Sequence, residues 1–182
     1  DNCKWNNTYY YINWKVSNYM STLSVDTIQG QTTAATVKLP AGCVIQTVNA
    51  ENATSTATSS TSFVSTNVAA TITPKFASSK ILVICQAMLR QNTGTATGSH
   101  IHAQIHRGGT AIGQFVDHGT REIAGPNNTD NVATGAILKV LDSPSTTSAT
   151  TYTVHIKTLS TDCSASVNSA GGSSMTLMEI AQ

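Results

Sequence analysis

The sequence predicts an all-β fold: an antiparallel β-sandwich or jelly-roll head that follows a short extended N-terminal segment. From residue 43 onward, apolar and polar residues alternate in short runs, which is the period of a strand with one buried face. Turn residues separate these runs at fairly regular spacing. No run of ten or more residues shows an apolar stripe of helical period between capping residues. Eight or nine short strands in this arrangement are typical of a sandwich or jelly roll.

Three segments are expected, at residues 1–19, 20–42 and 43–182. Residues 1–19 hold both tryptophans and most of the tyrosines, and their composition differs from that of all later residues. One interpretation, which we favour, is that Met20 is the natural start and that the leader is an artefact of the chosen reading frame. The other is that the leader is an aromatic anchor that docks on another protein. Residues 20–42 are expected to be an extended attachment or stalk segment, and residues 43–182 the head domain.

The first strands of the head follow a turn at Pro40 and Gly42. A strand is expected over residues 43–48. Ten of the thirteen residues from 54 to 66 are Ser or Thr, a composition that alone is typical of a linker. Phe63, Val64 and Val68 nevertheless predict that this tract ends in a strand that leads to Pro74.

Residues 80–90 have the pattern of a central strand. One face is apolar throughout, and the other is apolar at first and polar later, so we expect burial on both sides at its beginning. The apolar face comprises Ile81, Val83, Cys85, Ala87 and Leu89.

A β-hairpin is predicted next. Residues 99–107 alternate strictly with period two, and Gly108-Gly109 is a two-residue turn signal between two extended runs. Residues 110–118 are the expected partner strand. Residues 119–131 then form a polar loop containing Gly125-Pro126-Asn127-Asn128.

Four further runs complete the predicted sandwich, at residues 136–141, 150–159, 165–168 and 174–181. In the second of these, Tyr152, Val154, Ile156 and Thr158 share one face. Gly171-Gly172 separates the last two runs.

Composition excludes several classes of partner. Charged residues make up only 10% of the chain, the net charge is +1, and the basic residues are scattered singly. Nucleic-acid binding requires a clustered basic face, so no nucleic-acid partner is expected. No apolar run approaches the roughly 20 residues of a membrane helix, so no membrane insertion is expected. Four widely spaced cysteines without a C-x-x-C pair indicate free thiols and no structural zinc site.

Catalytic signatures are absent from the sequence, so an enzyme is not expected. The chain has no G-x-S-x-G elbow and no phosphate-binding glycine loop, and its acidic residues are isolated. Carboxylate pairs of glycosidases need not be close in sequence, which makes that last observation a weak one.

His100 and His102 are the candidate metal ligands. Residues two apart on a strand share a face and lie about 7 Å apart, so two imidazoles can reach one ion. If three chains met at an axis, three such pairs would offer an octahedral set of nitrogens to a transition metal. The alternative, which we favour, is that these histidines and His106 line a solvated face while Ile101, Ala103 and Ile105 face the core. No other cofactor is expected.

Seven blocks in sequence order carry a resemblance to a known family. The sequence resembles tail-fibre-like proteins of marine tailed bacteriophages, of the type that infects cyanobacteria. The match runs from Met20 to the C-terminus and excludes residues 1–19. The blocks are Met20-Ser-Thr-Leu-Ser-Val-Asp-Thr-Ile-Gln-Gly, Thr61-Ser-Phe-Val, Ile72-Thr-Pro-Lys, Ser78-Ser-Lys-Ile-Leu-Val, Arg107-Gly-Gly-Thr-Ala-Ile-Gly, Leu141-Asp-Ser-Pro-Ser-Thr-Thr-Ser-Ala-Thr-Thr-Tyr and Met175-Thr-Leu-Met-Glu-Ile-Ala.

This resemblance implies a virion structural protein, located in the tail or an appendage and assembled in the host cytoplasm. Its N-terminal segment would attach to other virion tail proteins, and its β-sandwich head would face the host. By extension from phage fibre tips in general, we expect a homotrimer, with a jelly roll like that of tumour necrosis factor or C1q heads.

The predicted role is host-surface attachment as a tail fibre or fibre tip, with a surface glycan or an outer-membrane protein as the receptor. The candidate contacts lie in the hairpin tip and the long loop: Arg107, Gly108, Gly109, Arg121, Asn127 and Asn128. For the arginines the alternative is an ordinary salt bridge with Glu122 or Asp117. For the whole protein the alternatives are a decoration, collar or adaptor protein without receptor contact and, as a third option, a polysaccharide depolymerase.

Overall fold

The computed structural model describes residues 39–92, 100–119 and 131–182. The leader and most of the predicted attachment segment lie outside the described residues, and Leu39–Gln182 forms one compact unit. The strands are β1 (Val44–Asn52), β2 (Thr56–Thr58), β3 (Val64–Ile72), β4 (Lys80–Asn92), β5 (His100–Arg107), β6 (Thr110–Ala111), β7 (Val116–Gly119), β8 (Asn131–Asp142), β9 (Thr150–Thr158), β10 (Ser164–Val167) and β11 (Ser173–Ile180).

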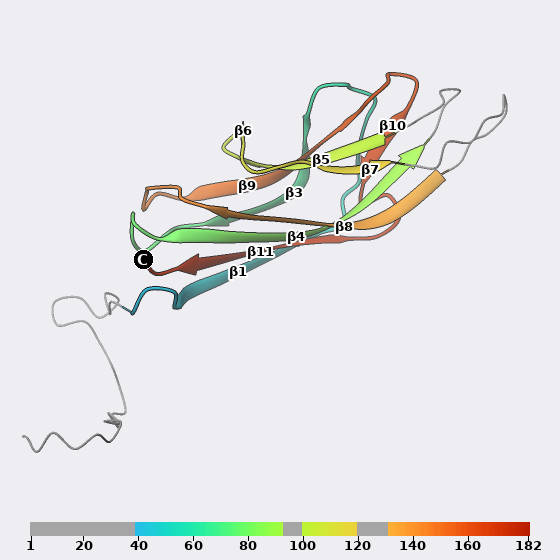
Figure 1. Cartoon of the computed structure of the whole chain (residues 1–182). Helices are drawn as coiled ribbons and strands as arrows, with labels where there is room; N and C mark the ends of the chain where they lie inside the picture. The colour runs from blue at the N-terminus through green and yellow to red at the C-terminus, as the bar shows by residue number, and fades with distance from the viewer. Residues whose placement is uncertain (1–38, 93–99, 120–130) are drawn as a thin grey trace, which may run out of the picture. The chain divides into compact units, whose positions relative to one another are not determined.

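The strands form two antiparallel sheets that pack face to face (Figure 1). Sheet A has the order β1-β11-β4-β10-β2, with β8 paired to the other edge of β4. Sheet B has the order β3-β9-β5-β6, with β7 also paired to β5. The predicted all-β antiparallel sandwich is confirmed. The described residues contain no helix long and apolar enough to cross a membrane.

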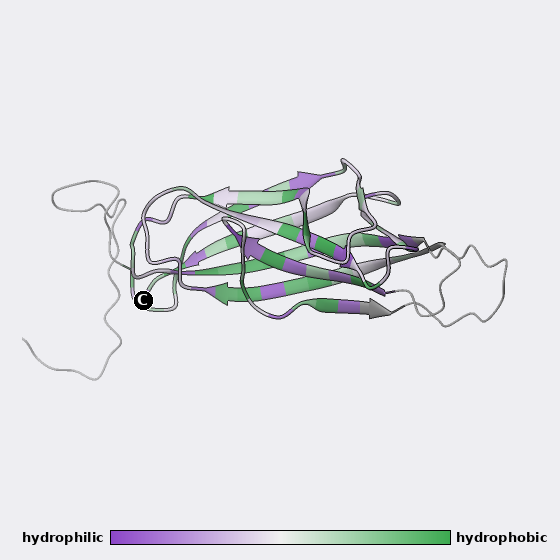
Figure 2. Ribbon diagram, turned by 90° about the horizontal axis from the view of Figure 1, so that it is seen from above, coloured by the Kyte–Doolittle hydropathy of each residue, from purple (hydrophilic) through white to green (hydrophobic). Residues whose placement is uncertain are grey.

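The core lies between the inner faces of the two sheets. On β4 the predicted apolar face, from Ile81 to Leu89, is completely buried, and on β9 the face from Tyr152 to Thr158 is equally buried. The buried faces that the two-residue alternation predicted for β4 and β9 are therefore confirmed. Figure 2 shows the corresponding alternation of hydropathy along the strands. The opposite face of β4 is half-buried at Leu82 and Ile84, so the predicted burial on both sides at the start of this strand is wrong.

Two details differ from the prediction. Residues 56–58 of the Ser/Thr tract form the short strand β2, which pairs with β10. The strand that returns from the Gly108-Gly109 turn is interrupted between β6 and β7, where Gly113 takes a positive φ of 73°. A Cβ at Gly113 would also lie 3.1 Å from Cγ2 of Val140, so both backbone conformation and space favour glycine there.

A buried carboxylate joins the end of β11 to the loop after β3. Glu179 lies on the inner face of β11 and is fully buried. Its Oε1 accepts hydrogen bonds from the backbone N–H groups of Lys75 (2.8 Å) and Phe76 (3.2 Å), and its Oε2 accepts one from Gln46 Nε2 (2.6 Å). The sequence indicated only an isolated acidic residue at this position.

The three described cysteines, Cys43, Cys85 and Cys163, are free, as predicted. Burial raises the pKa of the Cys85 thiol to about 12, because the core disfavours the thiolate. Cys85 therefore acts as a small apolar core residue.

Candidate functional site

The β5–β6 hairpin tip has the predicted two-residue turn. Gly108 and Gly109 both take positive φ values, 53° and 86°, as a type I′ turn requires. Nothing lies within 4 Å of a Cβ built at either residue, so the tip is open. Arg121, Asn127 and Asn128, the other predicted contacts, lie outside the described residues. The receptor-contact assignment stays a prediction for all of them.

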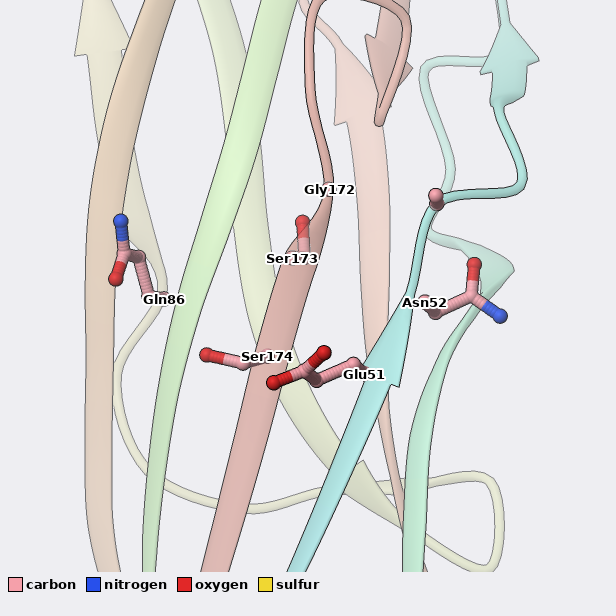
Figure 3. Close-up of a pocket in the computed structure, with 7 residues that line it drawn as sticks. Glu51, Asn52, Gln86, Gly172, Ser173 and Ser174 are labelled. Carbon is pink, nitrogen blue, oxygen red and sulfur yellow. The ribbon is translucent and has the colours of Figure 1, made fainter.

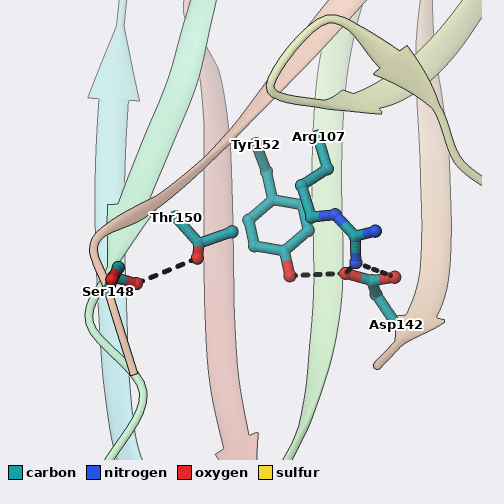
Figure 4. A network of polar contacts seen from close by, with 5 residues as sticks. All are labelled: Arg107, Asp142, Ser148, Thr150 and Tyr152. Atoms are coloured by element: carbon teal, nitrogen blue, oxygen red, sulfur yellow. Dashed lines mark hydrogen bonds and ion pairs between the residues drawn. The ribbon is translucent and has the colours of Figure 1, made fainter. Parts of the chain in front are cut away.

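Arg107, at the end of β5, is engaged in a network that spans the two sheets (Figure 4). Its Nη1 donates to both carboxylate oxygens of Asp142 at the end of β8, at 2.8 and 2.6 Å. The predicted salt-bridge partners were Glu122 or Asp117, so the partner assignment is wrong: the partner is Asp142.

Tyr152 completes this network. Its hydroxyl donates to Oδ2 of Asp142 at 2.7 Å, while its ring is buried in the core. Burial and the bond to Asp142 raise the pKa of Tyr152 above its ordinary value. Since Arg107 and Tyr152 belong to sheet B and Asp142 to sheet A, the network connects the sheets, which makes Arg107 first of all a structural residue.

Histidines and aromatic rings gather on the outer face of sheet B. His100, His102 and His106 share this face on β5, as predicted from their spacing, and His155 comes from the adjacent strand β9. The predicted solvent exposure is wrong for two of them, because His102 and His106 are only 6% and 7% exposed. Their rings are covered by aromatic side chains that come from Phe63, before β3, and Phe115, before β7.

Ring contacts account for this burial. His102 stacks on Phe115 at 4.6 Å between ring centroids, and His106 stacks on His155 at 3.7 Å with an interplanar angle of 4°. Phe63 lies beside His106, and the Lys157 ammonium group lies over the Phe63 ring at 5.1 Å. The result is an imidazole–aromatic surface, defined here by these histidines, Phe63 and Phe115.

The metal-site prediction gains no support from this surface. His100 Nδ1 lies 2.9 Å from Oδ1 of Asp117, and His102 Nε2 lies 3.4 Å from the same oxygen. Within the described ranges, no group of three or more His, Cys, Asp or Glu side chains has an arrangement that fits a metal ion. A metal at a trimer axis stays a prediction.

Acid should weaken this surface. Burial lowers the pKa of His102, with Lys157 and His100 adding to the effect and Asp117 opposing it. Burial, with the nearby His106, also lowers the pKa of His155. Moreover, His106 Nε2 is buried without a hydrogen-bond partner. Protonation of His155 would place a cation face to face with the His106 ring.

We therefore expect the melting temperature to fall by several degrees between pH 7.5 and pH 5. Because the pKa values of His102 and His155 are lowered in the folded state, the unfolded chain binds protons at a higher pH than the folded protein does. The contribution of these two residues to the free energy of unfolding is therefore fully present above the ordinary histidine pKa of about 6.5. It declines as the pH falls from there, until the folded protein is protonated too. Thermal unfolding at several pH values tests this. His155→Gln should flatten the profile, and an unchanged profile would contradict the assignment.

A shallow pocket lined mostly by polar residues lies on sheet A, near the end of β1 and the start of β11 (Figure 3). Its volume is about 390 Å³. The lining contains one carboxylate, two amides and two hydroxyls, and no cationic side chain. The lining residues are Glu51, Asn52, Ala53, Gln86, Gly172, Ser173 and Ser174. Sequence patterns did not indicate this site, because its side chains come together only through the strand register.

The outer face of sheet A also carries an apolar patch. Ile137 and Leu141 on β8 are 71% and 52% exposed. Leu141 lies opposite Leu82 on β4, and Leu82 lies opposite Met178 on β11, which gives a continuous apolar row across three strands. We call Leu82, Ile84, Ile137, Leu141 and Met178 the sheet A patch. Exposed apolar surface of this kind commonly marks an interaction site.

Comparison with known proteins leaves the family open. No family model and no curated protein matches the chain. Among solved structures, the chain is similar to the infectious bursal disease virus VP2 subviral particle, with a TM-score of 0.37 and 11% identity over 75% of this chain and 37% of that one. It is also similar to the T=1 particles derived from the same virus, with a TM-score of 0.32 and 10% identity over 88% and 41%. The chain spans well under half the length of these proteins, and likeness at this level carries no argument about function.

Proposed function

We propose that this chain is a virion structural protein of the tail-fibre type, which acts by adhesion to the host surface as a homotrimer. The resemblance of its sequence blocks to tail-fibre-like proteins of marine phages supports this proposal. The β-sandwich and the low content of charged residues agree with a head that functions against copies of itself and against a cell surface.

The sheet A patch is the observation that carries the self-association part of the proposal. Within the described residues, β8 pairs only with β4, so no strand is hydrogen-bonded to its other edge there. Lys139 lies between Ile137 and Leu141 on the outer face of β8, and its long side chain can extend to the rim of a contact and keep the ammonium group in water. We assign the patch to contact with a second copy of the chain, because such a contact would bury Ile137 and Leu141.

Light scattering on the full chain should give a mass of three copies. Ile137→Asp and Leu141→Asp should each shift the protein toward monomer at micromolar concentration, because a carboxylate buried in an apolar contact is strongly unfavourable. Ala133→Asp, on the same strand and the same face but outside the patch, is the matched control. Thermal unfolding of each variant separates dissociation from misfolding. A wild-type monomer, or trimers that persist in both patch variants, would refute the assignment.

Localisation tests the virion role directly. Gold-labelled antibody against the head should mark the tail or an appendage in electron micrographs of intact particles. Labelling of the capsid shell alone would favour a decoration role, and particles without label would reject the virion assignment.

A further inference from the structure

A row of three polar side chains crosses sheet A at the pocket. Glu51 on β1 lies opposite Ser174 on β11, which in turn lies opposite Gln86 on β4. Neighbouring strands are about 4.8 Å apart, so the row extends roughly 10 Å across the sheet. In Figure 3 the Glu51 carboxylate and the Ser174 hydroxyl lie close together, with the Gln86 amide beyond them on the next strand.

These three side chains are free to bind a ligand, whereas their polar neighbours are not. Glu51, Gln86 and Ser174 line the pocket, and within the described part of the chain none of their side chains is hydrogen-bonded to another protein group. By contrast, Asn52 Oδ1 accepts bonds from the Thr54 N–H (2.9 Å) and Asn168 Nδ2 (3.1 Å).

Ser173 is also engaged. Its hydroxyl donates to Oδ1 of Asn168 and accepts a bond from the Met88 N–H at 2.9 Å. Both Ser173 and Asn168 are buried. The pocket thus has a wall fixed by internal hydrogen bonds beside a row of unpaired groups, an arrangement preorganised for a polar ligand.

Gly172 leaves the space that a ligand would use. A Cβ at this position would lie 3.5 Å from the backbone oxygen of Asn52 and 3.8 Å from Cβ of Ala53, which are ordinary contact distances. A methyl group there would narrow the pocket without a clash.

We propose that this pocket binds a saccharide, specifically a neutral or amino-bearing sugar unit. A sugar offers adjacent hydroxyls that both donate and accept, which suits the acceptor oxygens of Glu51, the hydroxyl of Ser174 and the amide of Gln86. The negative charge of Glu51, in a lining without a cation, disfavours acidic sugars. The biological use of such a site, recognition of a cell-surface glycan, rests on the proposed adhesive function, but the binding chemistry does not.

Saturation-transfer NMR on the full chain tests this, with galactose, mannose, N-acetylglucosamine, glucosamine and glucuronate as probes. We expect saturable binding of at least one neutral or amino sugar and no binding of glucuronate. Glu51→Gln should weaken binding about tenfold, since a bond to a charged acceptor is stronger than one to a neutral acceptor. Gly172→Ala should weaken it at least as much. Gly135→Ala, at an open position on β8 outside the pocket lining, should leave binding unchanged.

The proposal is overturned if none of the four neutral or amino sugars binds saturably, if glucuronate binds as well as they do, or if binding is unchanged in both Glu51→Gln and Gly172→Ala. Sugar binding by a monomeric protein that is absent from virions would leave the site intact and reject the proposed function. A virion-located trimer that binds none of these sugars would reject the saccharide site and leave the proposed function intact.

Discussion

Replacement of Glu179 by alanine is expected to lower the free energy of unfolding by about 3–5 kcal/mol, because it removes a buried charged acceptor from several donors at once. The backbone N–H groups of Lys75 and Phe76 and the amide of Gln46 all lose this acceptor. For a protein of this size, the melting temperature should fall by roughly 10 °C. Denaturant titration and calorimetry measure both quantities.

Two further substitutions make the Glu179 test specific. Glu179→Gln keeps one carbonyl acceptor but turns an amide toward the Gln46 amide, so its effect should fall between those of wild type and alanine. Glu51→Ala, an exposed acidic residue on the adjacent strand β1, should change stability by less than about 0.5 kcal/mol. Equal stability of Glu179→Ala and Glu51→Ala would show that the buried carboxylate does not hold the loop.

Inner-face positions were predictable because strand periodicity directly encodes burial. The buried rows of β4 and β9 follow from alternation alone, and the Gly108-Gly109 turn follows from the need for positive φ at both positions. The same alternation places Glu179 on the face of Met175 and Leu177, so its burial could have been inferred. The donors to its carboxylate could not be inferred, because they depend on the register of β1 with β11 and on the path of the loop after β3.

Outer-face contacts were not predictable, because they depend on which strands become neighbours. The spacing of His102 and His106 fixed their face correctly, but burial there is produced by ring contacts with Phe115, just before β7, and with His155 on β9, and the alternation pattern does not give those contacts. Likewise the pocket row needs the register of β1, β11 and β4, which the alternation pattern does not reveal. The break between β6 and β7 was not predicted, because a single glycine at position 113 in an alternating run does not by itself show that the residue takes a positive φ.

Asp142→Ala is expected to destabilise the sandwich by about 2–4 kcal/mol, since it leaves the Tyr152 hydroxyl and the Arg107 guanidinium without their shared acceptor. Tyr152→Phe removes one neutral donor and keeps the packed ring, so about 1 kcal/mol is expected. Asp162→Ala, an exposed acidic residue in the turn before β10, serves as the control and should be nearly neutral. Equilibrium unfolding of the three variants tests this order. Similar stabilities for Asp142→Ala and Asp162→Ala would contradict it.

The same network determines how an adhesion experiment on Arg107 must be interpreted. Arg107→Ala removes the ion pair with Asp142 as well as any contact with a receptor, so reduced adsorption alone does not identify a binding residue. Tyr152→Phe weakens the network from inside the core and leaves the exposed surface unchanged, which makes it the matched control. If Arg107 contacts a receptor, Arg107→Ala should reduce adsorption more than Tyr152→Phe does at equal fractions of folded protein. If the two variants lose adsorption in proportion to stability, the role of Arg107 is to hold the two sheets together.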